Sequence, residues 1–323
     1  ERVAALTRNP SGDALTTMIH SGVRHLVMNK ADQAVAERCH RILSVEHEIE
    51  RKVCAYLALN LFSFPHNIER AFDIVDVPNP LLATVVKALL AVPQFFTRDG
   101  ARRRALAHIE ATAQEIHKAI RVIEEEDFRR EVLRGFMDGY SVSAVYAEDV
   151  SLRTLAQHRG ELIRMYLDLE GLARDANLPP REDGETIVRL GVLCPGTISE
   201  TAALRGHLVG LDRNVFQVTA FVPDEASSIS SNFDDVADDF ITLPTGDITE
   251  AAEIVGGEKL DILMVGANVT NTCRFPWTLL MAQRLARLQV AMHSSSLTTG
   301  FAEVDLYING ELNEPGDAAG EYT

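Results

Sequence analysis

Apolar residues in the first half of the chain recur every three or four positions, which is the spacing of one face of a helix. The longest such stretch runs from Ala34 to Leu61 and ends before Pro65. Further helices are expected over residues 81–91, 102–126, 128–137 and 152–172. The pattern therefore predicts an all-helical domain over residues 1–176.

The pattern changes after a segment rich in proline and charge, Asn177 to Glu185, which reads NLPPREDGE. We interpret residues 177–186 as a linker. Short apolar runs then alternate with helical segments: strands are expected over 187–193, 216–222, 240–243, 260–265, 288–292 and 304–308, and helices over 197–211, 249–255 and 276–286. Such alternation favours a parallel sheet, so residues 187–323 are expected to form a Rossmann-like domain.

Three polar loops, at 194–199, 266–271 and 293–300, directly follow expected strands. In parallel sheets, ligands bind beyond the carboxyl ends of the strands. The residues with ligand-binding chemistry in these loops are Thr197, Ser199, Asn268, Asn271, Ser294, Ser295, Thr298, Thr299 and Gly300. The alternative is ordinary turn chemistry, because turns favour the same small polar residues.

Two residues near these loops suit a catalytic proton transfer. His293 has the side chain best matched to neutral pH. Glu200 is a second candidate, although it lies three residues after Thr197 and so also fits a helix capping box. His207 falls inside the expected helix, where solvent exposure or packing is the simpler interpretation.

Composition narrows the classes of function. The length of 323 residues suggests about two domains, and the net charge of −16 argues against general nucleic-acid binding. The acidity is concentrated after residue 185, where 19 Asp and Glu face seven Lys and Arg. No apolar run is long enough to span a bilayer.

The cysteines and short motifs give little support for a zinc site, a disulfide framework or a nucleotide-binding loop. The four cysteines are scattered without a CxxC pair, which favours a reducing cytoplasm over a zinc or disulfide framework. Neither GxGxxG nor GxxxxGK[ST] occurs. The basic run 102–104 reads as a solvated helix face, and Phe62, Phe64, Phe95 and Phe96 read as core.

The run from Leu260 to Thr323 carries a specific ordered pattern. It contains DIL at 261–263, the turn from Asn268 to Asn271, RLARLQV at 284–290, a polar loop ending in TTG at 298–300, VDLYI at 304–308 and GEYT at the end. This order resembles the catalytic region of the O-linked N-acetylglucosamine transferase family, also called SPINDLY-like. It is also similar to the bacterial cytoplasmic protein N-glycosyltransferases. The resemblance covers residues 187–323 and is looser over 187–222.

The resemblance implies the first, acceptor-side half of a two-Rossmann, GT-B-type glycosyltransferase. It implies inverting, metal-independent transfer of a sugar from a nucleotide-diphosphate donor, usually a UDP-sugar, to Ser, Thr or Asn side chains of a protein acceptor. No cofactor is implied beyond the donor substrate. The helical region would then help to hold the protein acceptor, and it offers a surface for homo-oligomers.

Two departures from the family pattern qualify this expectation. The sequence ends where the family's donor-binding second domain begins, so we expect the chain as given to be inactive alone. The family also carries a histidine in the loop after the first strand, whereas residues 194–201 contain none. The alternatives are a non-catalytic protein-interaction module with a degenerate glycosyltransferase domain, or a small-molecule-binding α/β domain.

Overall fold

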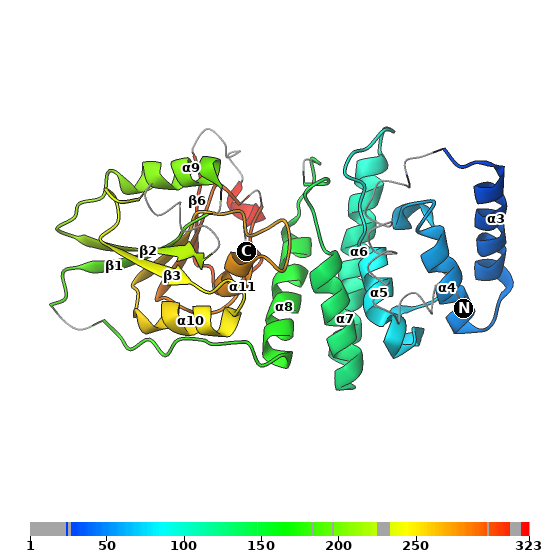
Figure 1. Cartoon of the computed structure of the whole chain (residues 1–323), viewed down its shortest axis with the longest axis horizontal. Coiled ribbons are helices and arrows are strands. Elements are labelled where there is room, and N and C mark those ends of the chain that lie inside the picture. Colours follow the sequence, from blue (N-terminus) through cyan, green and yellow to red (C-terminus); the bar gives the residue numbers. More distant parts are fainter. Residues whose placement is uncertain are drawn as a thin grey trace. The chain divides into compact units, whose positions relative to one another are not determined.

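The chain folds into two compact units, Glu1–Val150 and Ser151–Thr323. The computed structural model describes residue 24 and residues 27–146, 148–181, 184–195, 197–224, 233–295, 297–310 and 318–322. Gly196 and Ser296 of the polar loops, and Thr323 of the tail, lie outside the described residues. Figure 1 follows the chain through both units.

The first unit is helical throughout its described part. Its helices are α3 (Lys30–Val45), α4 (Ile49–Leu59), α5 (Asn79–Leu89), α6 (Ala101–Val122) and α7 (Glu126–Gly139), with the short 3-10 turns η2 (Pro65–Asn67) and η3 (Ile74–Asp76). The stretch expected as one helix from Ala34 to Leu61 is instead divided into α3 and α4. Glu46 accounts for the break, because its Oε1 accepts hydrogen bonds from the backbone N–H groups of His47 and Glu48.

The core of the helical unit follows from the three-and-four spacing of its apolar residues. Helices α5 and α7 pack against each other, and both bury nearly all of their large apolar side chains. Helix α6 buries a stripe through Ala105, Ile109, Ala113 and Ile116. Removing these side chains from water is the main stabilising term of the unit.

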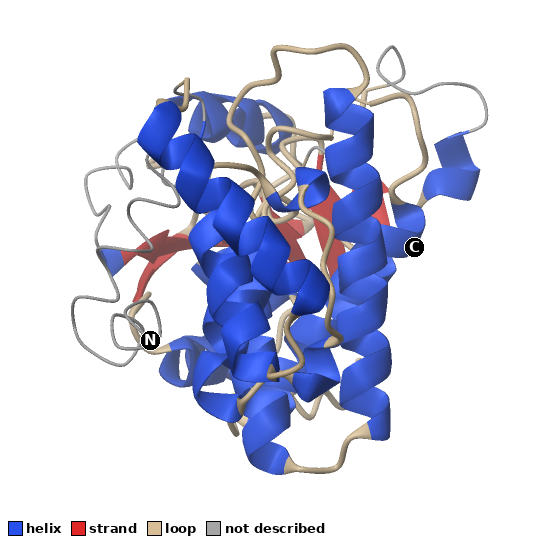
Figure 2. Ribbon diagram, turned by 90° about the vertical axis from the view of Figure 1, so that its right-hand side faces the viewer, coloured by secondary structure: helices blue, strands red, loops and turns tan. Residues whose placement is uncertain are grey.

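The second unit contains a six-stranded sheet, and the strands gather in one place in Figure 2. Its elements are α8 (Arg153–Leu169), β1 (Val188–Leu193), α9 (Ile198–Leu208), β2 (Phe216–Pro223), β3 (Asp239–Leu243), α10 (Ile248–Gly257), β4 (Ile262–Val265), α11 (Pro276–Met281), β5 (Leu288–Met292), β6 (Leu306–Ile308) and the 3-10 turn η6 (Ala318–Glu321). The strand order is β3-β2-β1-β4-β5-β6, and every pair is parallel. This is the Rossmann order, so the expected fold class is confirmed.

Helices cover both faces of the sheet, with α9 on one face and α10 on the other (Figure 1). Because both faces are covered, the central strands are apolar along most of their length, as is usual for parallel sheets. Strand β1 buries Leu190 and Val192 on one face, and α9 contributes Leu204 and Leu208 to the same core.

The boundary between the units differs from the expected linker at 177–186. Helix α8 and the segment after it belong to the sheet unit. The backbone N–H of Ala176 donates to the carbonyl oxygen of Arg284 at 2.8 Å, and Arg287 donates to the carbonyl oxygen of Pro179. Helical periodicity identifies α8 as a helix, but it does not say which core receives its apolar face.

Two helices of the sheet unit end earlier than expected. Helix α9 ends at Leu208, and α11 ends at Met281. After α11, the Gln289 side chain accepts the backbone N–H of Leu285 at 2.7 Å and takes the place of a helical partner.

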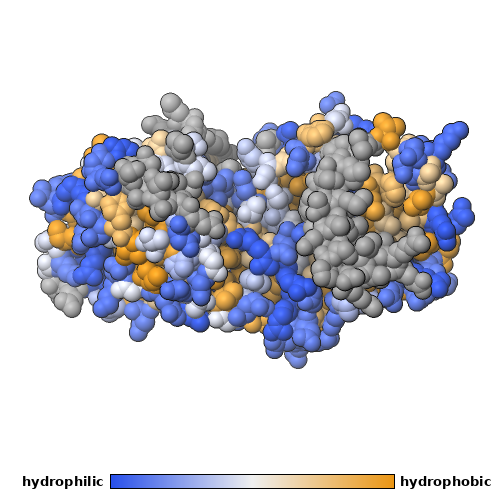
Figure 3. Space-filling view, viewed as in Figure 1, coloured by the Kyte–Doolittle hydropathy of each residue, from blue (hydrophilic) through white to orange (hydrophobic). Residues whose placement is uncertain are grey.

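The visible surface in Figure 3 is mostly hydrophilic, with scattered apolar side chains. No helix in the described part of the chain is both long and apolar enough to cross a bilayer.

Candidate functional site

Three polar loops meet at the carboxyl edge of the sheet. They follow β1, β4 and β5, which are consecutive, parallel neighbours. The strand order also reverses between β1 and β4, because the chain builds β2 and β3 on one side of β1 and then returns to the other side. Such a reversal opens a crevice at the carboxyl edge, which is the usual ligand site of these sheets.

Glu200 joins the first two loops. Its Oε1 accepts the backbone N–H of Asn268 at 3.0 Å, and its Oε2 accepts the Thr197 hydroxyl at 2.6 Å. Thr197 is the N-cap of α9 and accepts the Glu200 N–H, so half of the expected capping box is present. Because both carboxylate oxygens have partners, Glu200 is suited to hold the loops together.

Ser295 joins the loops that follow β4 and β5. Its Oγ accepts the backbone N–H of Val269 at 3.3 Å and donates to the carbonyl oxygen of Ala267 at 3.4 Å. The Tyr307 hydroxyl donates to the carbonyl oxygen of Ser295. Ser295 is completely buried, so its hydroxyl serves the fold.

Several other loop residues predicted to contact a ligand are also engaged within the protein. Asn268 Oδ1 accepts from the backbone N–H and hydroxyl of Thr270, at 3.0 and 2.9 Å. Thr298 and Thr299 are buried, and the Thr299 hydroxyl accepts the N–H of Phe301 at 3.3 Å. Thr197 and Ser199 are exposed at the start of α9.

Two of the predicted residues have polar atoms that the fold leaves unsatisfied. Asn271 Oδ1 and Ser294 Oγ are buried, and neither has a hydrogen-bond partner among the described residues. Buried polar atoms are nearly always paired, because an unpaired one costs free energy. Asn271 follows β4 and Ser294 follows β5, so both lie at the edge where a ligand could satisfy them.

His293 lies beside a residue that no sequence pattern pairs with it. Its ring centroid is 5.5 Å from that of His207, with 48° between the ring planes. His207 is exposed on α9, and His293 is half-buried directly after β5. Two imidazoles therefore lie beside each other, although the residues are far apart in the chain.

Arg159 of α8 holds the loops after β4 and β5 by hydrogen bonds, a role that the sequence analysis did not predict. The residue is 1% exposed, and its guanidinium donates to the carbonyl oxygens of Val269, Thr272 and Thr299 at 2.6, 2.6 and 3.1 Å. A usable signal was present, since Arg159 interrupts an apolar helical stripe that includes Leu155, Ala156, Leu162 and Ile163. Arginine in such a stripe needs buried acceptors.

The charged residues of the RLARLQV pattern lie at the opposite, amino edge of the sheet. Arg284 pairs with Asp305 at 2.6 Å, and Arg287 pairs with Asp261 at 2.9 Å. The two carboxylates also accept backbone N–H groups, of Gln289 and Arg189 respectively. These residues fix the starts of strands and do not reach the carboxyl edge.

The cysteine at the end of β1 is not a nucleophile at neutral pH. Burial raises the pKa of Cys194 to about 12, so the thiol stays protonated. Within the described ranges, no three His, Cys, Asp or Glu side chains are arranged to hold a metal ion.

Comparisons with known proteins find a likeness to solved structures. No family model and no curated protein matches the sequence. The structure is similar to that of a mutant of the O-GlcNAc transferase of Thermobaculum terrenum, with a TM-score of 0.42 and 17% identity. The match covers 100% of this chain and 57% of the other, so the chain spans little more than half of that protein's length. A likeness at this identity and TM-score does not carry a function from one protein to the other.

Proposed function

We propose that the sheet unit is the acceptor-side half of a GT-B-type, inverting, metal-independent protein glycosyltransferase. The donor would be a nucleotide-diphosphate sugar, with UDP as the nucleotide implied by the resemblance, and the acceptor would be a Ser, Thr or Asn side chain of a protein. The observation that carries the proposal is a pair of buried atoms, Asn271 Oδ1 and Ser294 Oγ, that have no hydrogen-bond partner among the described residues and lie in the loops that resemble the transferase pattern.

These two atoms have the chemistry that a sugar or acceptor hydroxyl needs. Asn271 Oδ1 accepts a hydrogen bond, and Ser294 Oγ both donates and accepts. They follow neighbouring strands, so one ligand at the carboxyl edge could contact both. Binding would then remove the cost of leaving them unpaired, which contributes to holding an acceptor in line with the donor.

Transfer would proceed by attack of the acceptor oxygen or nitrogen on the anomeric carbon. The bond from that carbon to the diphosphate breaks, and its electron pair leaves with the diphosphate. The acceptor's proton would pass to His293, whose side chain suits this step at neutral pH. We assign the proton to His293 rather than Glu200 because both Glu200 oxygens already accept hydrogen bonds.

The test uses the whole natural protein. It would be incubated with UDP-sugars and other nucleotide sugars, together with co-expressed candidate acceptor proteins. The masses of the acceptors would then be measured by intact-mass spectrometry. We expect a mass shift of one sugar with at least one donor. Asn271→Ala and Ser294→Ala should each lower the rate by about tenfold or more, because each removes a polar contact to the reacting groups.

Asn214→Ala is the matched control, because Asn214 is exposed and precedes β2 at the other edge of the sheet. It should leave the rate unchanged. Absence of a mass shift with every donor would reject catalysis and favour a non-catalytic interaction module. An equal loss of rate in Asn214→Ala would show that Asn271 and Ser294 have no special role.

A further inference from the structure

The helical unit contains a cavity of about 610 Å³. Its walls come from the segment before α3, the segment around η2, the connection between α5 and α6, and the first turn of α6. This volume is within the range of cavities that enclose small organic molecules. We call it the helical cavity.

The charge of the helical cavity is opposite to that of the chain. Its lining includes Arg24, Arg98, Arg104 and His66, and no Asp or Glu is found among the described residues that line it. The whole chain carries a net charge of −16. Asp99 follows Arg98 in the sequence but does not line the cavity. A cluster of cations without a carboxylate produces a local field that attracts anions.

The strongest evidence for a bound anion is the buried guanidinium of Arg24. It is 7% exposed, and its Nε, Nη1 and Nη2 atoms are buried without a hydrogen-bond partner in the described part of the chain. Its guanidinium lies 4.8 Å from the centroid of the Phe64 ring, which is a cation–π contact and not a hydrogen bond. Burial lowers the pKa of Arg24 to about 10. A guanidinium left in this state is costly, and an anion with several acceptor oxygens would satisfy it.

Two further features of the lining favour the same kind of ligand. His66 Nδ1 is buried and has no partner among the described residues, so it is a second free polar atom at the cavity. Helix α6 begins at the cavity with Gly100 as its N-cap, and no side chain caps that end. The start of a helix carries a partial positive charge, which adds to the attraction of an anion.

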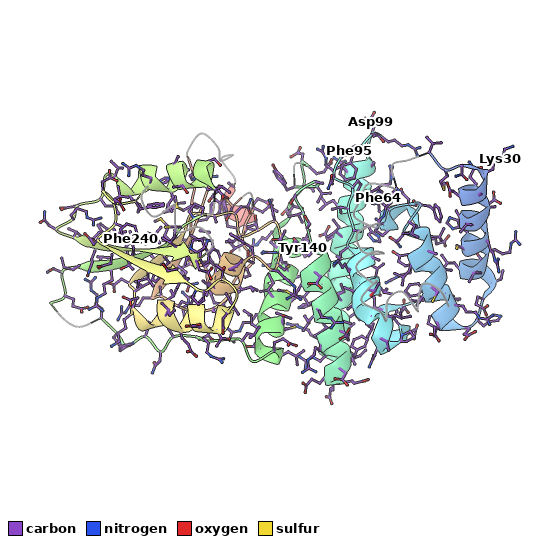
Figure 4. All side chains as sticks on the ribbon, viewed as in Figure 1. Lys30, Phe64, Phe95, Asp99, Tyr140 and Phe240 are labelled. Atoms are coloured by element: carbon purple, nitrogen blue, oxygen red, sulfur yellow. The ribbon has the colours of Figure 1, made fainter. Side chains whose placement is uncertain are left out.

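Aromatic side chains form the apolar part of the lining. The four residues Phe62, Phe64, Phe95 and Phe96 all line the cavity, where the sequence suggested core. Phe95 is 55% exposed, and Figure 4 shows Phe64 and Phe95 toward the same end of the helical unit. An aromatic ring of a ligand could stack on these rings, a contact that is favourable beyond the burial of apolar area.

The basic run 102–104 divides between two roles. Arg102 and Arg103 lie 3.9 and 3.6 Å from the Glu148 carboxylate, which offsets one of their two positive charges. Arg104 lines the cavity. The interpretation of residues 102–104 as a solvated helix face therefore does not describe Arg104, which lines the cavity. Arg103 does not line it, so a variant of Arg103 is a suitable control.

We infer that the helical cavity binds a small organic anion that joins a phosphate or carboxylate group to a planar aromatic ring. The anionic group would contact Arg24, Arg104 and the start of α6, and the ring would lie against Phe64 and Phe95. This inference concerns the helical unit and does not depend on the proposed sugar transfer.

Isothermal titration calorimetry on the full chain tests this with three probes: phenyl phosphate, inorganic phosphate and benzyl alcohol. We expect phenyl phosphate to bind saturably with a Kd below about 1 mM. Inorganic phosphate should bind more weakly because it lacks the ring, and benzyl alcohol should show no saturable binding because it lacks the charge.

Variants assign the binding to the cavity. Arg24→Gln and Arg104→Gln should each raise the Kd of phenyl phosphate by about tenfold, the loss expected for one charge-assisted contact. Phe95→Ala should weaken phenyl phosphate while leaving inorganic phosphate unchanged. Arg103→Gln is the matched control and should leave both unchanged. Arg104 and Phe95 are exposed, so their variants decide the matter even if Arg24→Gln fails to fold.

Three results would overturn the inference. The first is the absence of saturable binding of phenyl phosphate up to about 10 mM. The second is binding of benzyl alcohol as tight as that of phenyl phosphate. The third is weakening by Arg103→Gln as large as that caused by Arg104→Gln.

Discussion

Arg159 donates a hydrogen bond to the carbonyl oxygen of Thr299, 3.1 Å away, although 140 positions separate the two residues. The same guanidinium also holds the carbonyl oxygens of Val269 and Thr272. One side chain of α8 therefore ties together the loops that follow β4 and β5. The shape of the carboxyl edge depends on a residue that belongs to neither loop.

Arg159→Met should destabilise the sheet unit by about 3 kcal/mol or more, because three carbonyl oxygens, two of them buried, would lose a charged donor. Chemical unfolding followed by the fluorescence of Trp277, the single tryptophan of the chain, measures this. Hydrogen exchange should also rise in residues 269–272 and 299–301. Arg153→Gln is a control on the same helix, since Arg153 is exposed and its guanidinium donates to the carbonyl oxygen of Gly320 and not to the loops. Equal exchange in wild type and Arg159→Met would show that Arg159 does not hold the loops.

Gly160→Ala should also destabilise the sheet unit, by about 2–4 kcal/mol, because a Cβ at this position would lie 1.9 Å from the carbonyl oxygen of Gly300. Neither backbone can move without disturbing α8 or the loop after β5. Gly206→Ala on α9 is the matched control, since its Cβ would meet nothing within 4 Å. That change should be stabilising by up to about 1 kcal/mol, the gain from alanine in a helix. Thermal unfolding of both variants compares them, and similar melting temperatures would contradict the close packing of Gly160 on Gly300.

Cys194 should make the sheet unit less stable in alkali. Burial raises the pKa of its thiol from 9.0 to about 12, so the folded state keeps a proton that the unfolded state releases. The stabilising effect is therefore complete below pH 9 and is lost as the pH rises toward 12. Cys194→Ala should flatten this part of the stability profile, measured by urea unfolding at pH 8 and pH 10. Cys273 of the same unit adds to this slope, because burial raises its pKa to about 11. Cys54→Ala, in the helical unit, should leave the slope reported by Trp277 unchanged, and a slope equally steep in Cys194→Ala and in wild type would refute the assignment.

His66 should make the helical unit less stable in mild acid. Burial is the main cause that lowers the pKa of His66 from 6.5 to about 4, and the nearby His108, Arg104 and Arg24 lower it further. The unfolded state then binds a proton at a pH where the folded state does not. Stability is complete above pH 6.5 and is lost as the pH falls toward 4. The difference in melting temperature between pH 7 and pH 5, followed by circular dichroism, should shrink in His66→Gln. The exposed His47→Gln should behave as wild type, and an unchanged difference in His66→Gln would count against the prediction.

The order of elements could be predicted from the sequence because it depends on local patterns. The three-and-four spacing gave the helices, and short apolar runs gave every strand of the sheet to within two residues at each end. Predicted helix boundaries were wrong where a side chain accepts backbone N–H groups in place of the helix, as the Glu46 carboxylate does. They were also wrong where a residue outside the helix accepts the N–H group, as the Gln289 side chain does for Leu285. Periodicity also could not assign α8 to a unit, because a stripe of apolar residues does not name its partner.

The candidate site could be predicted only in part, because its hydrogen bonds join residues that are distant in the sequence. Hydroxyl and amide side chains directly after the expected strands identified the three polar loops. Parallel pairing of those strands then predicted that the loops share one edge of the sheet. The sequence did not separate Ser294, which keeps an unpaired hydroxyl among the described residues, from its neighbour Ser295, which is used by the fold. That distinction depends on which hydrogen-bond partners the neighbouring loops supply.

The sequence by itself determined a helical half, an alternating half and polar loops after the strands, because spacing and turn chemistry act over a few residues. Tertiary structure alone decided that β1, β4 and β5 are neighbours, that His207 lies beside His293, and that Arg159 supports two loops. It also decided that Arg24 is buried in the helical cavity, where the described lining residues include no carboxylate. Each of these is a contact between residues distant in the chain, and such contacts are fixed only when the cores form.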